Sequence, residues 1–160
     1  MREISMGAFM KTTCGFFAGL LLGLGASTAG AAEVAVGKSS GTLPEGLPFS
    51  EVIRVNDTYY LSGQIGVAGG EMKLVPGGIE AETRQTLENI RAVLQANDLD
   101  LQHVVKCLVM LADMDDWGAF NTIYASYFKP PYPTRSAIGA NGLALGARVE
   151  LECMAVRRLR

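Results

Sequence analysis

Arg135 is the residue whose type and position most clearly call for a chemical explanation. It follows a run that contains Pro130, Pro131 and Pro133, and it stands beside Ser136 at the start of a short apolar stretch. A guanidinium next to buried positions is costly unless it meets an anion. The sequence therefore predicts an anionic partner for Arg135.

Two carboxylates later in the chain are candidates for that partner. In the predicted strand 147–156, Glu150 and Glu152 share one face, because side chains alternate along a strand. Arg135 could meet one of them in its own chain or in a neighbouring subunit. Spacing alone favours a structural Arg–Glu pair at a subunit boundary, while a site in which Arg135 binds a ligand stays open.

Other chemistries find little support in the sequence. The single histidine, His103, lies beside an apolar run and is predicted to be a surface residue at a strand end, which argues against a Ser-His-Asp triad. The sequence has no Cys/His cluster of the kind that would indicate a metal site. Ser62 is interpreted as a turn hydroxyl that bonds a ligand or the backbone.

Cys107 and Cys153 both lie in apolar, strand-like segments. The pattern favours two buried thiols on separate strands. A disulfide between them is the alternative, since an exported chain can form one.

Hydrophobic patterns predict the elements that must position these residues. A hairpin is expected over 49–67 and a helix over 79–100, with Leu87, Ile90 and Leu94 as its apolar stripe. An almost wholly apolar strand over 104–112 leads into a second helix, which the prolines end after residue 128.

Two further strands, 134–140 and 147–156, complete a ββαβαββ order. That order predicts an α+β fold of two layers, with both helices on one face of a single sheet. The other face carries Leu108, Met110 and Met154 among charged side chains, and a half-apolar face of this kind predicts an oligomer.

The N-terminus has the layout of a secretory signal peptide. Residues 1–32 combine two basic residues, an apolar Gly-rich run and a cluster of small residues, which indicates export to the periplasm or out of the cell without stable membrane association after cleavage. Residues 33–48 are predicted to be a flexible arm, and residues 49–158 a single domain. The net charge of −2 and the absence of a basic run argue against nucleic-acid binding.

Several segments resemble the RidA/YjgF family in order and spacing, over roughly residues 44–158. They are YYLSGQIG (59–66), TRQTLENIRAVL (83–94), VVKCLVMLADMDDWGAFNTIYASYF (104–128), YPTRSAIG (132–139) and VELECMAVR (149–157). The resemblance implies a chorismate-mutase-like fold and a homotrimer with three clefts at its subunit interfaces.

The resemblance also implies an activity and a site. The deaminase branch of the family hydrolyses reactive 2-imino acids and enamines to 2-keto acids and ammonia, with no metal or organic cofactor. Arg135 matches the residue that binds the substrate carboxylate, and Glu150 matches the acid that positions or activates water, with Glu152 as the fallback. The matching cleft residues are Ser62, Gly63, Asn121, Ala137 (through its backbone N–H) and Phe49, which stands where that branch usually has tyrosine.

Two other functions remain as alternatives. The first is a trimeric module that binds a small carboxylate without chemistry. The second is an endoribonuclease or translation-inhibitor role.

Overall fold

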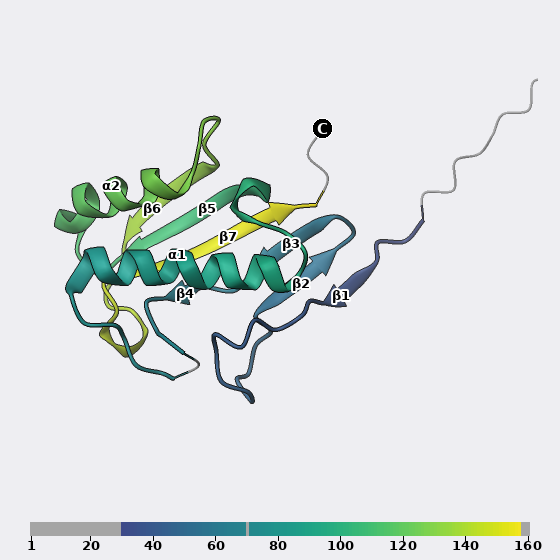
Figure 1. Cartoon of the computed structure of the whole chain (residues 1–160), viewed down its shortest axis with the longest axis horizontal. Coiled ribbons are helices and arrows are strands. Elements are labelled where there is room, and N and C mark those ends of the chain that lie inside the picture. The colour runs from purple at the N-terminus through teal and green to yellow at the C-terminus, as the bar shows by residue number, and fades with distance from the viewer. Residues whose placement is uncertain (1–29, 70, 158–160) are drawn as a thin grey trace, which may run out of the picture. The chain divides into compact units, whose positions relative to one another are not determined.

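The computed structural model describes residues 30–69 and 71–157, which form one seven-stranded sheet and two α-helices (Figure 1). The strands are β1 (Val34–Val36), β2 (Val52–Val55), β3 (Thr58–Leu61), β4 (Gln64–Ile65), β5 (Val104–Leu111), β6 (Thr134–Gly139) and β7 (Val149–Val156). The helices are α1 (Gly78–Ala96) and α2 (Trp117–Tyr127), and three short 3₁₀ turns are Leu101–His103, Met114–Asp116 and Ala144–Gly146.

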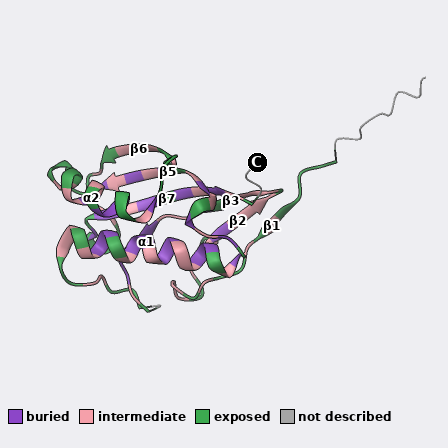
Figure 2. Ribbon diagram, turned by 45° about the horizontal axis from the view of Figure 1, so that its top comes forward, coloured by how far each residue is buried: buried purple, intermediate pink, exposed green. Residues whose placement is uncertain are grey.

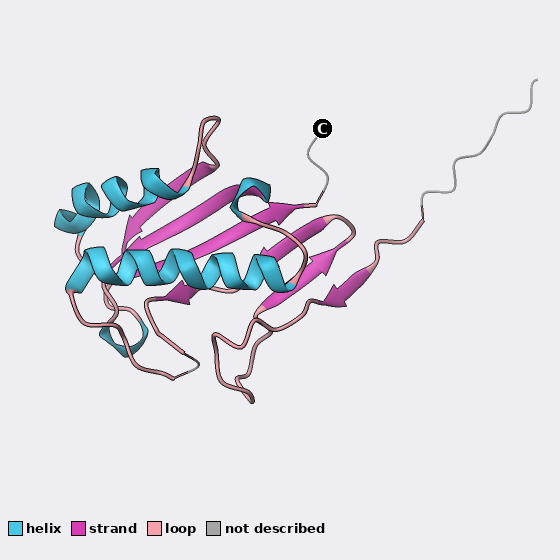
Figure 3. Cartoon of the chain, in the orientation of Figure 1, coloured by secondary structure: helices cyan, strands magenta, loops and turns pink. Residues whose placement is uncertain are grey.

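The strands lie in the order β1-β2-β3-β7-β5-β6, and β4 pairs with β7 beyond the end of β3. Among the strands of the described residues, β5 and β6 are the one parallel pair, and α2 makes the crossover between them. Both helices lie against the same face of the sheet (Figure 3), which confirms the predicted α+β arrangement of two layers.

The core fills the space between the helices and the sheet. Leu87, Ile90 and Leu94 of α1 are at most 1 % exposed, so the predicted apolar stripe is the buried face of this helix. Figure 2 shows that burial is concentrated on the inner side of α1 and along the central strands β5 and β7. The edge strand β6 is more open.

The N-terminal part of the domain is more structured than a flexible arm. Within the predicted arm 33–48, β1 pairs antiparallel with β2. The Glu51 carboxylate then accepts hydrogen bonds from the Ser40 backbone and from the hydroxyls of Ser40 and Thr42. Sequence composition could not reveal these contacts, because they depend on a strand and a carboxylate elsewhere in the chain.

The predicted hairpin also differs in detail. Its second strand is interrupted at Ser62 and Gly63, so that β3 pairs with β2 and β7 while the short β4 continues along β7 alone. The interruption places Ser62 and Gly63 in a bend rather than within a regular strand.

Cys107 and Cys153 form a disulfide, so the favoured interpretation as two free thiols is wrong in this structure. The two residues are register partners on the neighbouring strands β5 and β7, with Cα atoms 4.1 Å apart. Apolar flanks indicate burial for both cysteines, but they do not reveal which strands are neighbours.

The outer face of the sheet has no helix over it in the described part of the chain. Leu108, Met110 and Met154 are half-buried there, with Glu152 and Lys106 exposed beside them. This is the half-apolar face that the sequence predicts. Across the described residues, no helix has the length and hydrophobicity needed to cross a membrane. Residues 1–29 of the predicted signal peptide lie outside the described residues.

Candidate active site

Arg135 lies on the edge strand β6 and points under α2. Its Nη2 donates a hydrogen bond to Asn121 Oδ1 at 2.6 Å. The centre of the guanidinium also lies 4.9 Å from the Trp117 ring, 5.4 Å from the Phe120 ring and 4.7 Å from the Tyr124 ring. The amide and the three rings of α2 therefore hold the cation in place.

No carboxylate within the described residues forms an ion pair with Arg135. Other arginines of the domain behave differently, since Arg148 pairs with Asp116 and Arg54 with Glu33. Arg135 is half-buried and its one polar partner, Asn121, is neutral. Because a guanidinium has five N–H donors, most of its edge stays available for an incoming anion.

Tyr124 lies in the same environment. Burial raises the pKa of Tyr124 to about 12, although the charge of Arg135 acts in the opposite direction. The phenol is therefore neutral at physiological pH, and its buried hydroxyl has no hydrogen-bond partner in the described part of the chain. Tyr124 thus contributes an uncharged ring and does not neutralise Arg135.

Ala137 follows two residues after Arg135 on β6 and packs on the main core. Its side chain is on the same face as Arg135, because residues i and i+2 of a strand share a face. We call Asn121, Arg135 and Ala137 the arginine half-site.

Glu150 lies on β7, opposite Met110 of β5 and Ile65 of β4. Partial burial raises the pKa of Glu150, and the negative charge of Glu152 raises it further. Both effects favour the protonated acid. Glu150 can therefore accept and release a proton at a pH closer to neutral than an ordinary glutamate can.

Gly63 leaves the space that the Glu150 carboxylate occupies. A Cβ atom at residue 63 would lie only 1.9 Å from Glu150 Oε1, so no other residue fits there unless Glu150 moves. This contact explains why a glycine follows Ser62 in the bend between β3 and β4.

Ser62 and Phe49 complete this group. The Ser62 hydroxyl donates to the Ser50 carbonyl at 2.7 Å, and the Ser62 N–H donates to the Glu51 carbonyl at 2.9 Å. Ser62 thereby ties the bend at Gly63 to the entry of β2, where Phe49 is 51 % exposed. We call Phe49, Ser62, Gly63 and Glu150 the glutamate half-site.

The two half-sites lie on opposite faces of the sheet. Arg135 is the register partner of Cys107, whose side chain faces the core, while Glu150 is the register partner of Met110, whose side chain faces outwards. Register partners point to the same face, and residues three apart on a strand point to opposite faces. The expectation that Arg135 could meet Glu150 or Glu152 within its own chain is therefore wrong.

The aromatic rings around Arg135 are the part of the site that sequence reasoning missed. In the sequence, Trp117, Phe120, Tyr124 and Phe128 lie at i, i+3, i+7 and i+11, a spacing typical of one face of a helix. Phe120 and Tyr124 do belong to the core, but both of them and Trp117 also contact the charged Arg135. The sequence feature that could have indicated this contact is an aromatic stripe on a helix, followed by an arginine on the next strand.

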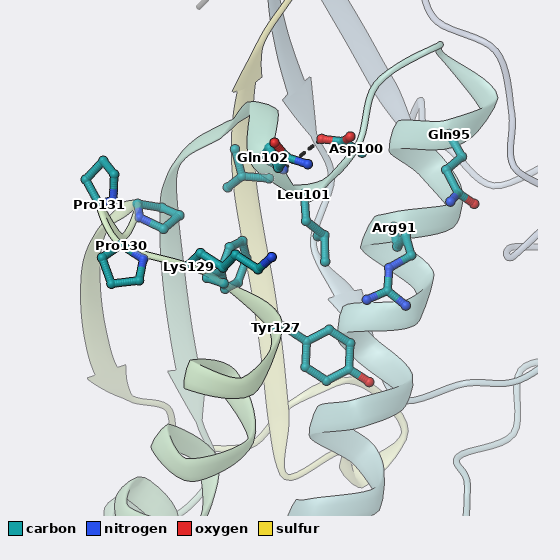
Figure 4. Close-up of a pocket in the computed structure, with 12 residues that line it drawn as sticks. Arg91, Gln95, Asp100, Leu101, Gln102, Tyr127, Lys129, Pro130 and Pro131 are labelled. Atoms are coloured by element: carbon teal, nitrogen blue, oxygen red, sulfur yellow. Dashed lines mark hydrogen bonds between the residues drawn. The ribbon is translucent and has the colours of Figure 1, made fainter.

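A cavity of about 610 Å³ opens elsewhere, between the C-terminal halves of α1 and α2 (Figure 4). Arg91 lines it, but the Arg91 guanidinium already donates to both oxygens of Glu88 and stacks on the Tyr127 ring at 5.1 Å. None of the predicted site residues lines this cavity. It is therefore not the candidate active site. No group of three or more metal-ligating side chains occurs among the residues that the structure covers.

The fold and the two half-sites define a class of α+β protein with an arginine on an edge strand and a glutamate on the open sheet face. The family described as endoribonuclease L-PSP matches residues 42–157, and the chain belongs to this family, which is the RidA/YjgF family. Among curated relatives, the 2-iminobutanoate/2-iminopropanoate deaminase of Mus musculus is 43 % identical over 110 residues, covering 69 % of this chain and 82 % of the relative. The Homo sapiens protein of the same name is 40 % identical and covers 69 % and 80 %.

Solved structures agree with this assignment. RidA from the Antarctic bacterium Psychrobacter sp. superposes with a TM-score of 0.70 at 32 % identity, covering 74 % of this chain and 97 % of that one. Escherichia coli TdcF with bound serine gives a TM-score of 0.69 at 25 % identity, covering 76 % and 98 %.

Proposed function

We propose that this protein hydrolyses small 2-imino acids and their enamine tautomers to 2-keto acids and ammonia, without a cofactor. The names of the deaminase relatives support this activity. The observation that carries it is the state of Arg135, a half-buried guanidinium held by Asn121 and aromatic rings, with no acidic partner in the described chain. The free edge of Arg135 fits a substrate carboxylate bidentately.

The proposed hydrolysis needs the substrate to be positioned and one group, Glu150, to transfer protons. The imine carbon is already electrophilic, so the site needs to orient it towards a water molecule. Glu150 accepts a proton from the water as its oxygen bonds to this carbon, and returns a proton to the nitrogen. In the resulting amino alcohol, Glu150 takes the hydroxyl proton and delivers it to the nitrogen. The C–N bond then breaks, its electron pair leaves with the nitrogen as ammonia, and the oxygen forms the carbonyl of the 2-keto acid.

We propose that the complete site forms between subunits of a homotrimer. One chain presents Arg135 and Glu150 on opposite sheet faces, so it cannot aim both at one substrate. Three chains packed through their half-apolar sheet faces would bring the glutamate half-site of each next to the arginine half-site of a neighbour. The half-buried Leu108, Met110 and Met154 and the free outer edge of β6 support this packing.

We also propose that the domain works after export, in the periplasm or outside the cell. The layout of residues 1–32 motivates this, and the Cys107–Cys153 disulfide supports it because such bonds persist in oxidising compartments. Imines produced there by oxidation of amino acids or amines are the corresponding substrate class.

The direct test is the release of ammonia and keto acid from 2-iminobutanoate generated in situ. Loss of the carboxylate contact in Arg135→Ala should lower kcat/KM by roughly 100-fold or more, and Arg135→Lys should recover only part of it, because an ammonium lacks the planar fork. Wild-type activity no higher than that of Arg135→Ala would refute the proposal. Binding of 2-oxobutanoate without turnover would instead favour the non-catalytic binding module.

A further inference from the structure

Trp117 differs from the other two rings that contact Arg135. Phe120 and Tyr124 are 0 % and 4 % exposed and belong to the core, whereas Trp117 is 36 % exposed. The three residues lie on one face of α2, so Trp117 occupies its open, N-terminal end. Core packing thus explains two of the rings but not the third.

The position of Trp117 is well defined despite its exposure. It begins α2 directly after the 3₁₀ turn Met114–Asp116, which Asp113 caps by accepting a hydrogen bond from the Asp115 N–H at 2.9 Å. The Asp116 carboxylate at the end of the turn is fixed by Arg148 at 2.6 Å. The indole is therefore presented to Arg135 from an anchored helix start, at 4.9 Å from the guanidinium centre.

Arg135 makes two kinds of contact, one to the faces of its planar guanidinium and one to the N–H groups at its edge. Aromatic rings interact with the face of a guanidinium, while carboxylates and amides bind the N–H groups at its edge. Asn121 takes one of these edge donors, and Trp117 contributes to fixing the plane in which the others lie. Together with the Phe120 and Tyr124 rings, the indole therefore restricts how the guanidinium can turn, and thus the direction in which its remaining N–H groups can meet a carboxylate.

We propose that Trp117 is a positioning residue for the carboxylate-binding step, and that it acts through Arg135 without contributing to proton transfer. This inference rests on the proposed function, since it assigns a carboxylate ligand to Arg135. It predicts that loss of the indole weakens ground-state and transition-state binding equally. The consequence is a raised KM with little change in kcat.

The test compares wild type with Trp117→Leu and Trp117→Phe on 2-iminobutanoate, with thermal unfolding of each variant as the control for folding. Trp117→Leu should raise KM roughly threefold to thirtyfold, the range expected when a cation–π contact is lost, and should change kcat less than about threefold. Trp117→Phe keeps a ring and should recover most of the loss. An unchanged KM in a folded Trp117→Leu, or a fall in kcat alone, would overturn the proposal.

A second measurement on unmodified protein does not depend on how the variants fold. Trp117 is the only tryptophan of the sequence, so its fluorescence reports on this position alone. Titration with 2-oxobutanoate should change the emission in step with binding measured by calorimetry, and Arg135→Ala should abolish both signals. Calorimetric saturation with no change in emission would contradict the inference.

The two measurements separate this inference from the proposed function. Turnover of 2-iminobutanoate with normal KM in Trp117→Leu would leave the function standing and refute the role of Trp117. Binding of 2-oxobutanoate that weakens in Trp117→Leu, without turnover in wild type, would refute the function and support the role. Neither binding nor turnover in wild type would refute both.

Discussion

Arg135 and Glu150 lie on opposite faces of one sheet, although the reaction we propose needs both at one substrate. The strand β5 separates β6 from β7, and its residues Cys107 and Met110 fix the opposite orientations of the two side chains. A single chain is thus a pair of half-sites. The reaction as proposed therefore requires a second subunit to complete each site.

The first prediction concerns the acid side of the pH profile. Glu150 must be ionised to accept a proton from water, and its pKa lies above the ordinary value of 4.5 because of burial and the charge of Glu152. The acid limb of kcat/KM should therefore have its midpoint above 4.5. The Glu152→Gln variant removes the negative charge that raises the pKa of Glu150, so it should move this midpoint to lower pH. A midpoint that stays fixed or moves upwards in this variant would show that another group controls the limb.

Gly63→Ala is expected to disable the site without unfolding the domain. The new Cβ would lie 1.9 Å from Glu150 Oε1, so the flexible end of the glutamate must move by more than an ångström. A displacement of this size should lower kcat by roughly 100-fold. Gly118→Ala on α2 is the matched control, because a Cβ there meets no atom within 4 Å, and it should keep wild-type activity. Equal kcat values for the two variants would argue against Glu150 as the proton-transfer group.

The disulfide should contribute measurably to stability. It closes a loop between residues 46 positions apart, and a covalent link of this length is expected to stabilise the domain by about 2–4 kcal/mol. Urea unfolding of the chain comprising residues 33–160, with and without reductant, measures this difference directly. Two titratable thiols in the unfolded chain, prepared without reductant, would contradict the presence of the bond.

Much of the fold could be predicted because its signals are local. The stripe of Leu87, Ile90 and Leu94 and the apolar run 104–112 identify α1 and β5 from periodicity alone. The strand β1 was not predicted, since three residues without strong alternation become a strand only through pairing with β2.

The sequence nominates residues for the site but does not show how they are arranged. Arg135 and Glu150 stand out by residue type and strand alternation, while Asn121, Gly63 and the roles of all four residues come from resemblance to the family. The register of β6 on β5 and of β5 on β7 decides which of these side chains share a face of the sheet. The register between strands that are far apart in the chain cannot be predicted from local sequence patterns. The same register joins Cys107 to Cys153.

The most direct test of the account is complementation between two inactive variants. Arg135→Ala and Glu150→Gln should each be nearly inactive alone. When they are unfolded and refolded together in equal amounts, random assortment into cyclic trimers should regenerate intact sites and about a quarter of wild-type deaminase activity on 2-iminobutanoate. No recovery, in mixtures shown by native mass spectrometry to contain mixed trimers, would contradict a site shared between chains.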